Sequence, residues 1–326
     1  MSRRRLFSIR SICIATLCIA IAVAVSCAAV LVYQALIVPR NTEQSISEYR
    51  NIRQEMPDPT ELQTPSASDS EPQITPDNTP SQYSESDMLP AFKEMYIIND
   101  DIIGWLNIPS VDVDHPVFYT PENQNYYLNR APDGTRSSTG SLFMSKGSEI
   151  NPQANVLVIY GHKMRNGTMF GKLTRYKKLE TLVSNPTFTF DTLYEQGTWK
   201  IIAAATTSID MDANDFYYLR NSYASEEEFY DFIKKLRMRS LFMIDDDGSY
   251  EDRYLILSTC DATHFKNQRF IVVARRLRSD ETTDMSSCRY IVNDMPLMPL
   301  EYYARTGNKK PSDDDLWEHY TLFYGT

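Results

Sequence analysis

The chain has 326 residues, with 33 lysines and arginines against 43 aspartates and glutamates, and a formal net charge of −10. Hydrophobic residues make up 42% of it, which is enough for a sizeable core and excludes wholesale disorder. Five cysteines exclude a disulfide-rich miniature scaffold, and four histidines leave little material for a multi-histidine metal centre. The acidic balance argues against a nucleic-acid binder, which needs a basic surface.

The charge is unevenly distributed along the chain. Residues 1–40 carry a net charge of +5, residues 41–90 carry −8, and residues 91–326 carry −7. We therefore expect three regions with three different roles. The length allows one large domain with appendages or two small domains.

An uncharged, mostly apolar run covers residues 11–39. A transmembrane helix needs about 20 apolar residues, whereas the apolar part of a cleaved signal peptide is about 7–15 residues long, so the length favours an uncleaved anchor. A lipoprotein signal ending at Cys27 is disfavoured because residues 28–38 remain apolar. Four arginines precede the run and only Arg40 follows closely, which predicts a cytoplasmic N-terminus and an exported remainder.

Residues 40–90 are acidic and rich in proline, serine and threonine, with hardly any large apolar side chains. Such a composition cannot bury enough surface to offset the entropy of ordering the chain. It predicts a disordered stalk that holds the following domain away from the membrane.

Short strands dominate the prediction for the rest of the chain. A helix is expected to begin near Ala91, because apolar residues recur at helical spacing from Phe92 to Trp105. The predicted strands cover residues 111–119, 141–144, 156–160, 188–191, 199–206, 254–258 and 270–274. A capping box at residues 225–228 opens one strong helix, which ends in basic residues near Arg239. Many strands and few helices indicate a mainly β fold, a closed barrel or a sandwich.

Three chemically capable side chains stand at the ends of predicted strands. Cys260 follows the run 254–259, Arg269 opens the next strand, and His162 follows the strand 156–160. If the strands of Cys260 and Arg269 are antiparallel neighbours, both residues lie at the same end of the sheet. A thiolate is a nucleophile, histidine exchanges a proton, and arginine stabilises an oxyanion without losing its own proton. Together they suit acyl transfer through a thioester. A disulfide between Cys260 and Cys288 is the alternative.

The run Ile256-Leu257-Ser258-Thr259-Cys260, with Arg269 on the following strand, resembles the signature of the sortase transpeptidases. Residues 160–171 look like the histidine region of class B sortases, and residues 101–109 and 126–128 resemble the start of that catalytic domain. The capped helix at 225–239 falls where class B members carry an extra helix between two late strands. The resemblance covers residues 91–278. It implies a closed eight-stranded sortase-type β-barrel on the outer face of a Gram-positive membrane, without a metal or organic cofactor.

Composition and resemblance together divide the chain into five parts. These are a cytoplasmic basic segment at 1–10, a transmembrane signal-anchor at 11–39, a disordered stalk at 40–90, a catalytic domain at 91–278 and a C-terminal extension at 279–326. The expected location is the cell membrane, crossed once, with the catalytic domain outside.

The resemblance assigns roles to the three strand-end residues. Cys260 would be the nucleophile, His162 the general acid and base, and Arg269 the clamp on the oxyanion or substrate carbonyl. The family would cleave a sorting signal after threonine and pass the acyl group to an amine of a cell-wall precursor or a pilin subunit. The class B likeness favours an Asn-Pro-x-Thr-like signal over Leu-Pro-x-Thr-Gly.

Five further residues are candidates for substrate binding: Ser258, Thr259, Asp261, Tyr217 and Tyr218. Asp261 could bind substrate or tune Cys260, and a surface carboxylate is an equal alternative. The two tyrosines precede the capped helix, where the substrate loop of this family would lie, and they could contact the signal peptide or simply pack.

Other classes of protein fit less well. An L,D-transpeptidase would need histidine and arginine closely flanking the cysteine, and a papain-like protease would place its cysteine before its histidine. A membrane-anchored binding module with an inert Cys260 is the rival from a different class, and thiol reactivity separates it from an enzyme.

Three further features receive plain interpretations. His264 is expected to be a loop residue near the site, and Asp245–Gly248 a solvated turn, because the spaced ligands and closing glutamate of a calcium loop are missing. His115 stands where the family resemblance leads us to expect an aromatic or aliphatic residue.

Overall fold

Eight strands close into a single barrel in the computed structural model, which describes residues 9–33, 37–55, 83–210, 216–246 and 248–324. The barrel strands are β1 (Ile102–Ile108), β2 (Val113–Phe118), β3 (Leu142–Met144), β4 (Val156–Tyr160), β5 (Thr187–Thr192), β6 (Thr198–Ser208), β8 (Tyr254–Cys260) and β9 (Gln268–Arg276). Their order around the barrel is β1, β2, β3, β4, β8, β9, β6 and β5, and β5 pairs with β1 to close it. The closed barrel confirms the predicted mainly β fold.

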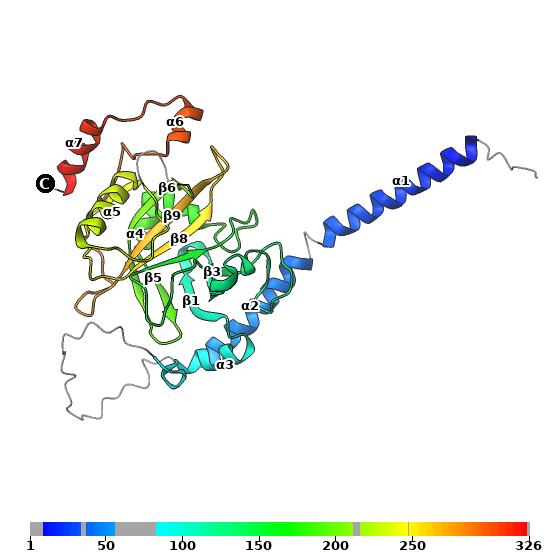
Figure 1. The fold of residues 1–326 in the computed structure, drawn as a ribbon, viewed down its shortest axis with the longest axis horizontal. Helices are drawn as coiled ribbons and strands as arrows, with labels where there is room; N and C mark the ends of the chain where they lie inside the picture. The colour runs from blue at the N-terminus through cyan, green and yellow to red at the C-terminus, as the bar shows by residue number, and fades with distance from the viewer. Residues whose placement is uncertain (1–8, 34–36, 56–82, 211–215, 247, 325–326) are drawn as a thin grey trace, which may run out of the picture.

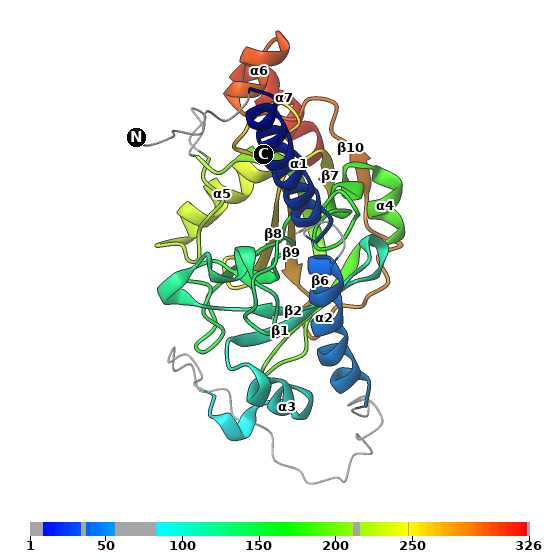
Figure 2. The same ribbon diagram turned by 90° about the vertical axis from the view of Figure 1, so that its right-hand side faces the viewer.

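Helices lie around the barrel, except α1, which projects away from it (Figure 1). The helices are α1 (Ile9–Val32), α2 (Val38–Glu55), α3 (Pro90–Ile98), α4 (Leu179–Ser184), α5 (Glu226–Arg239), α6 (Leu300–Thr306) and α7 (Asp313–Tyr324). The second sheet pairs β7 (Phe242–Ile244) with β10 (Tyr290–Val292). Both ribbon views place α2 and α3 at one end of the barrel and α6 and α7 at the other (Figure 2).

Alternate residues of β4 face two different apolar clusters. Leu157 and Ile159 belong to the cluster that fills the barrel, whereas Val156 and Val158 belong to a second cluster outside it. Side chains alternate across a strand, so a strand covered on both faces reads as a continuous apolar run. The outer cluster is completed by α5, which contributes Phe229 among other buried residues. The covering of both faces explains why β4 is apolar at consecutive positions of the sequence.

The capped helix forms as predicted. The hydroxyl of Ser225 accepts a hydrogen bond from the backbone N–H of Glu228 at 3.2 Å, which satisfies one of the donors that a helix N-terminus leaves free. Arg237 and Arg239 lie in the last turn of α5, where positive charge is favoured.

The helix expected from Ala91 onward is wrong beyond Ile98. Residues 90–98 form α3, and Asn99 ends it in an extended conformation. The apolar residues that continue the pattern, from Ile102 to Ile108, form β1 between β2 and β5. Almost every residue of β1 is buried, and a strand buried on both faces has no alternation that separates it from a helix.

The predicted stalk is wrong for residues 40–55 and 83–90. Residues 38–55 form α2, and Thr42, Ser45, Ile46 and Tyr49 share one buried face at helical spacing. Tyr83 stacks on Tyr194 with ring centroids 4.8 Å apart, and α3 begins at residue 90. An average composition over 50 residues hides such a short amphipathic helix. The middle of the predicted stalk, residues 56–82, lies outside the described residues.

Two arginines fasten α2 to the barrel. Arg50 donates to Asp114 of β2 at 2.7 Å, and Arg53 donates to Asp191 of β5 at 2.6 Å. The Arg53 guanidinium also lies 5.2 Å from the centroid of the Trp105 ring. The helix after the apolar segment is therefore part of the folded domain.

The N-terminal apolar segment forms α1, which projects away from the barrel (Figure 1). Its stretch Ile14–Val32 has 19 residues and a mean hydropathy of 2.7, and none of it is buried against the rest of the chain. By length and composition it is able to cross a membrane.

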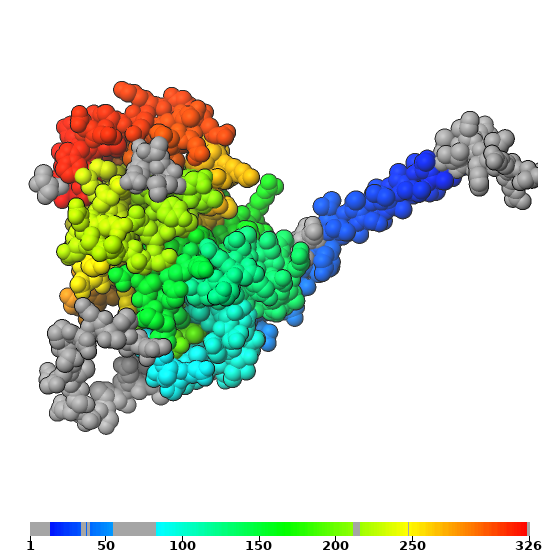
Figure 3. All heavy atoms as spheres, in the orientation of Figure 1, coloured from blue at the N-terminus to red at the C-terminus, as the bar shows by residue number. Residues whose placement is uncertain are grey.

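The C-terminal extension is structured and packs on the barrel. Figure 3 shows α6 and α7, in orange and red, covering the same end of the molecule as α5. The Lys234 ammonium of α5 lies 3.9 Å from the centroid of the Trp317 ring of α7.

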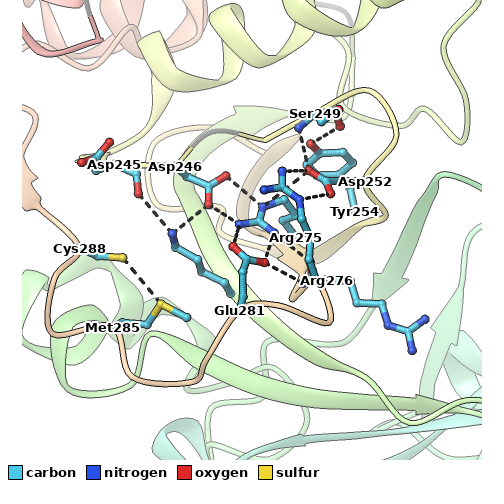
Figure 4. A network of polar contacts seen from close by, with 12 residues as sticks. Asp245, Asp246, Ser249, Asp252, Tyr254, Arg275, Arg276, Glu281, Met285 and Cys288 are labelled. Atoms are coloured by element: carbon cyan, nitrogen blue, oxygen red, sulfur yellow. Dashed lines mark hydrogen bonds and ion pairs between the residues drawn. The ribbon is translucent and has the colours of Figure 1, made fainter.

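A buried ion network joins this extension to the start of β8 and the end of β9 (Figure 4). The guanidinium of Arg275 is fully buried and donates to both carboxylate oxygens of Asp246 and of Glu281, at 2.6–3.2 Å. Lys200 adds a second cation, 2.9 Å from Asp246. The sequence suggested that Asp246 belongs to a solvated turn. This interpretation is wrong, because Asp246 is the counter-charge of two buried cations. Asp247 lies outside the described residues.

His115 is an ionisable residue inside the apolar barrel. It lies in β2 opposite Leu106 and is almost completely buried. Burial lowers the pKa of His115 from its ordinary 6.5 to about 4, with Arg50 lowering it further and Asp114 opposing the shift. The folded chain therefore keeps this imidazole neutral under conditions in which an exposed histidine is charged.

Ile46→Ala should destabilise the folded domain by about 2–5 kcal/mol, because it removes buried methyl groups from the contact of α2 with the barrel. Urea unfolding measures this free energy. The exposed Glu48 on the same helix provides the control, and Glu48→Ala should change it by less than about 0.5 kcal/mol. Equal, small effects of both variants would contradict the packing of α2.

His115→Phe should flatten the pH dependence of stability between pH 6.5 and 4. In that window the unfolded wild-type chain binds a proton at His115 that the folded chain rejects, so wild-type stability falls as the pH is lowered. The phenylalanine variant lacks this loss, which amounts to about 3 kcal/mol for a pKa that folding lowers from 6.5 to about 4. Free energies of unfolding at pH 7, 6, 5 and 4 check it. Parallel curves for both proteins would contradict the burial of a neutral His115.

Candidate active site

The sheet brings Cys260 and Arg269 face to face. Cys260 is the last residue of β8, Arg269 is the second residue of β9, and the two are direct partners in the antiparallel β8–β9 pairing. The expectation that they lie at the same end of the sheet is confirmed. The Cys260 side chain is exposed to solvent and free of any disulfide.

His162 reaches the same end of the sheet from the other side of β8. Strand β4 runs parallel to β8, with Tyr160 opposite Ser258. Two hydrogen bonds continue this contact beyond β4: the Gly161 N–H donates to the Ser258 carbonyl at 3.2 Å, and the Thr259 hydroxyl donates to the Gly161 carbonyl at 2.8 Å. Continuing the same register by two residues would bring His162 level with Cys260.

Gly161 allows this close approach. A Cβ atom at residue 161 would lie 2.6 Å from side-chain carbons of both Leu142 and Phe170, far inside van der Waals contact. Any larger residue would have to displace one of these core side chains, and His162 would move with the backbone.

One hydrogen bond determines the tautomer of His162. Its Nε2 atom lies 2.7 Å from the backbone carbonyl of Leu128, in the short helical turn Tyr126–Asn129. A carbonyl oxygen can only accept, so Nε2 carries the proton and Nδ1 is the basic nitrogen. The ring is half-buried, which keeps it in reach of solvent and of a bound molecule.

The other cysteine of the folded domain lies elsewhere. Cys288 belongs to the C-terminal extension, where its thiol contacts the Met285 sulfur at 3.7 Å (Figure 4). Both Cys260 and Cys288 are free, so the alternative of a disulfide between them is wrong.

Three of the predicted substrate-binding residues are buried and make their contacts inside the fold. Ser258 and Thr259 are buried, and Tyr218 is fully buried with its hydroxyl 2.8 Å from the Ser258 hydroxyl. Burial raises the pKa of Tyr218 above its ordinary range. These contacts fix the segment before the capped helix onto the strand that ends in Cys260.

Tyr217 is half-buried and directly precedes the fully buried Tyr218. Burial raises the pKa of Tyr160, Tyr217 raises it further and Arg269 lowers it. Tyr160 itself lies opposite Ser258, two residues before Cys260.

Asp261 is almost completely buried, at 1% exposure, so the interpretation as a surface carboxylate is wrong. One carboxylate oxygen accepts from Lys163 at 2.6 Å and from Thr263 at 3.0 Å. The other accepts from Lys177 at 2.5 Å and from Gln268 at 3.1 Å. Burial alone would raise the pKa of Asp261, but the hydrogen bonds and charges of the two lysines outweigh it and lower the pKa.

His264 is an exposed loop residue between β8 and β9, as expected. Its ring meets Tyr302 of α6 edge to face, with centroids 5.0 Å apart. The C-terminal extension thus touches the loop that follows Cys260.

Sequence reasoning missed the partners of Asp261 and the carbonyl of Leu128. Lys163 and Gln268 are chain neighbours of His162 and Arg269, and that adjacency is the only signal for them. Lys177 lies far away in sequence and carries no signal at all. Among the side chains that the structure describes, no group of three or more His, Cys, Asp or Glu residues could hold a metal ion.

Comparison with known proteins connects this geometry to one family. The model of the sortase domain matches residues 106–277. Sortase B of Listeria monocytogenes is 29% identical over 169 residues, which are 52% of this chain and 66% of that protein. Sortase B of Staphylococcus aureus is 26% identical over 190 residues, covering 58% of this chain and 75% of that protein.

Solved structures agree with the sequence matches. A structure of sortase B from Bacillus anthracis superposes with a TM-score of 0.59 at 25% identity, covering 74% of this chain and 98% of that one. A Staphylococcus aureus sortase B–substrate complex superposes with a TM-score of 0.53 at 26% identity, covering 59% of this chain and 87% of that one. The fold of this chain is therefore similar to that of solved sortase B structures.

Proposed function

The chain belongs to the sortase family of cysteine transpeptidases, within class B, and from that premise we propose that it cleaves a peptide sorting signal through a thioester on Cys260. The observation that carries the proposal is the pairing of Cys260 with Arg269, beside the end of β4 where His162 follows. A nucleophile, a proton carrier and a permanent cation meet there at one end of a rigid sheet.

The first step forms the thioester. The Cys260 thiolate attacks the carbonyl carbon of the scissile peptide bond, and the negative charge that develops on the carbonyl oxygen is stabilised by the Arg269 guanidinium. Protonated His162 gives a proton to the departing amine as the C–N bond breaks. The products are an acyl group on the Cys260 sulfur and a free amine on the released peptide.

The second step transfers the acyl group. An incoming amine attacks the thioester carbonyl, His162 takes up the proton that the amine loses, and the Cys260 thiolate leaves. Water in place of the amine gives hydrolysis. Arginine keeps its charge throughout, so Arg269 can stabilise both oxyanions but cannot carry the proton.

We propose an Asn-Pro-x-Thr-like donor signal cleaved after threonine, and as acceptor an amine of a cell-wall precursor or of a pilin subunit. The class B relatives support the donor, and one of the neighbouring Staphylococcus aureus structures is described as a substrate complex. Of the five candidate binding residues, Tyr217 is partly exposed, whereas Ser258, Thr259, Asp261 and Tyr218 are buried. Tyr217 is therefore our candidate for contact with the peptide. The four buried residues support the site through their contacts inside the fold.

The proposed place of action is the outer face of the cell membrane. The apolar helix α1 would anchor the chain, residues 1–10 would remain in the cytoplasm, and the barrel would lie outside. Within this proposal residues 91–278 are the catalytic domain, supported on one end by α2 and on the other by the extension 279–326.

Incubation with a signal peptide and no acceptor amine should leave a covalent acyl adduct on Cys260, detectable by mass spectrometry. Cys260→Ala should abolish the adduct and the cleavage, whereas Cys288→Ala is the matched control and should retain most of both. His162→Ala should slow adduct formation by about 10²–10⁴-fold because the leaving amine lacks its proton donor. Arg269→Lys should slow it by about 10²–10³-fold, since lysine keeps the charge but loses the planar fork.

The contrary results are equally specific. Equal loss in Cys260→Ala and Cys288→Ala would remove the nucleophile assignment. Wild-type adduct rates in His162→Ala or Arg269→Lys would remove that residue from the mechanism.

Protease added to intact protoplasts that express the chain should digest the barrel while sparing a short N-terminal fragment. The four arginines before the apolar run favour retention of that fragment in the cytoplasm. Immunoblotting against tags at both ends reads the result. Full protection of the C-terminal tag until the membrane is permeabilised would refute this topology.

A further inference from the structure

The chain neighbours of the proposed catalytic residues meet at one buried carboxylate. Lys163 directly follows His162, Gln268 directly precedes Arg269, and the side chains of both donate to Asp261. Asp261 itself is the residue after the proposed nucleophile. The Asp261 side chain therefore contacts both the chain neighbour of His162 and the chain neighbour of Arg269.

All the main acceptor positions of this carboxylate are filled. Its two oxygens take two hydrogen bonds each, from Lys163 and Thr263 on one side and from Lys177 and Gln268 on the other. The backbone N–H of Asp261 also donates to the Gln268 carbonyl at 3.1 Å, which extends the β8–β9 pairing by one step. A carboxylate so placed allows little freedom to the backbone on either side.

Burial makes the arrangement rigid. A buried carboxylate that loses its partners is strongly destabilised, so the lysines and the glutamine cannot leave it without a large cost. Lys177 is held from a second direction as well, with its ammonium 5.3 Å from the centroid of the Phe270 ring. These contacts join the ends of three strands, β4, β8 and β9, at the point where the chemistry is proposed.

We propose that Asp261 is a positioning residue, whose contacts with Lys163, Lys177 and Gln268 hold His162 and Arg269 in place at Cys260. The proposal rests on the proposed function for the roles of those three residues. It replaces substrate binding by Asp261, because a side chain with 1% exposure and four donors of its own has neither surface nor acceptor capacity to offer a peptide.

The same strands supply a matched control at their other end. Asp246 is also a buried carboxylate, paired with Lys200 and Arg275, and Arg275 lies opposite Tyr254 at the start of β8. Asp246→Asn and Asp261→Asn therefore remove the same chemical group from contacts at the two opposite ends of β9. Only Asp261→Asn changes a residue next to the proposed active site.

The test measures single-turnover acylation of the full chain in detergent micelles by an Asn-Pro-x-Thr-containing peptide, for the wild type and the two variants. Asp261→Asn should lower the acylation rate at saturating peptide by about 10–100-fold, as expected when reacting groups are misplaced by about 1 Å, with the half-saturating peptide concentration unchanged. Asp246→Asn should keep the wild-type rate at temperatures below its melting point. Lys177→Gln leaves Asp261 its other hydrogen-bond donors, so it should lower the acylation rate by a smaller factor. This variant provides the test if Asp261→Asn does not fold.

Two outcomes of this measurement would overturn the proposal. An unchanged saturating rate in both Asp261→Asn and Lys177→Gln would show that the contacts do not position the site. A raised half-saturating concentration with an unchanged saturating rate would make Asp261 a substrate-binding residue instead.

A second readout separates this proposal from the proposed function. Alkylation of Cys260 by iodoacetamide needs no peptide. Asp261→Asn should change its rate at least about threefold relative to the wild type and to Asp246→Asn, because the residue that directly follows the thiol loses its fixed contacts and the surroundings of Cys260 change with it. Absence of any peptide adduct in the wild type would refute the proposed function alone. Equal alkylation rates in all three proteins would refute the positioning role.

Discussion

The pairing of β8 with its two neighbours is the constraint on which the rest of the structure depends. The antiparallel contact with β9 brings Arg269 to Cys260, and the parallel contact with β4 brings a distant part of the chain to the same sheet end. Register in a sheet is all or nothing, since a shift of one residue would turn every side chain to the opposite face. Both faces of β4 and β8 pack against different apolar clusters, so such a shift would move every side chain into the other cluster and disrupt its packing.

Ion networks secure the two strands β8 and β9 at both ends. At one end Arg275 binds Asp246 and Glu281 and thereby ties the C-terminal extension to the barrel (Figure 4). At the other end Asp261 binds two lysines next to the exposed Cys260. Buried ion pairs add little net stability but are costly to break, so they are suited to fixing a geometry. The strands between them are apolar and supply most of the cohesion.

Sequence reasoning succeeded where local pattern and chemistry agree. The strand ending in Cys260, the strand opened by Arg269 and the capped helix were predictable because apolar runs, caps and reactive side chains are local signals. It failed for β1, whose two buried faces mimic a helix, and for α2, whose buried face is hidden in an acidic, proline-rich average. It also failed for Asp246 and Asp261, because burial of a carboxylate depends on cations such as Lys177 and Arg275 that only the tertiary fold brings close.

The most direct test of the account is a crystal structure of the chain with a signal-mimicking peptide joined to the Cys260 sulfur. The account predicts that the peptide carbonyl oxygen lies within hydrogen-bond distance, about 2.7–3.2 Å, of the Arg269 guanidinium, with Nδ1 of His162 facing the leaving side of the same carbonyl. Asp261 should remain buried beneath it and make no contact with the peptide. A peptide bound with Arg269 turned away, or with His162 on another face of the barrel, would contradict the account.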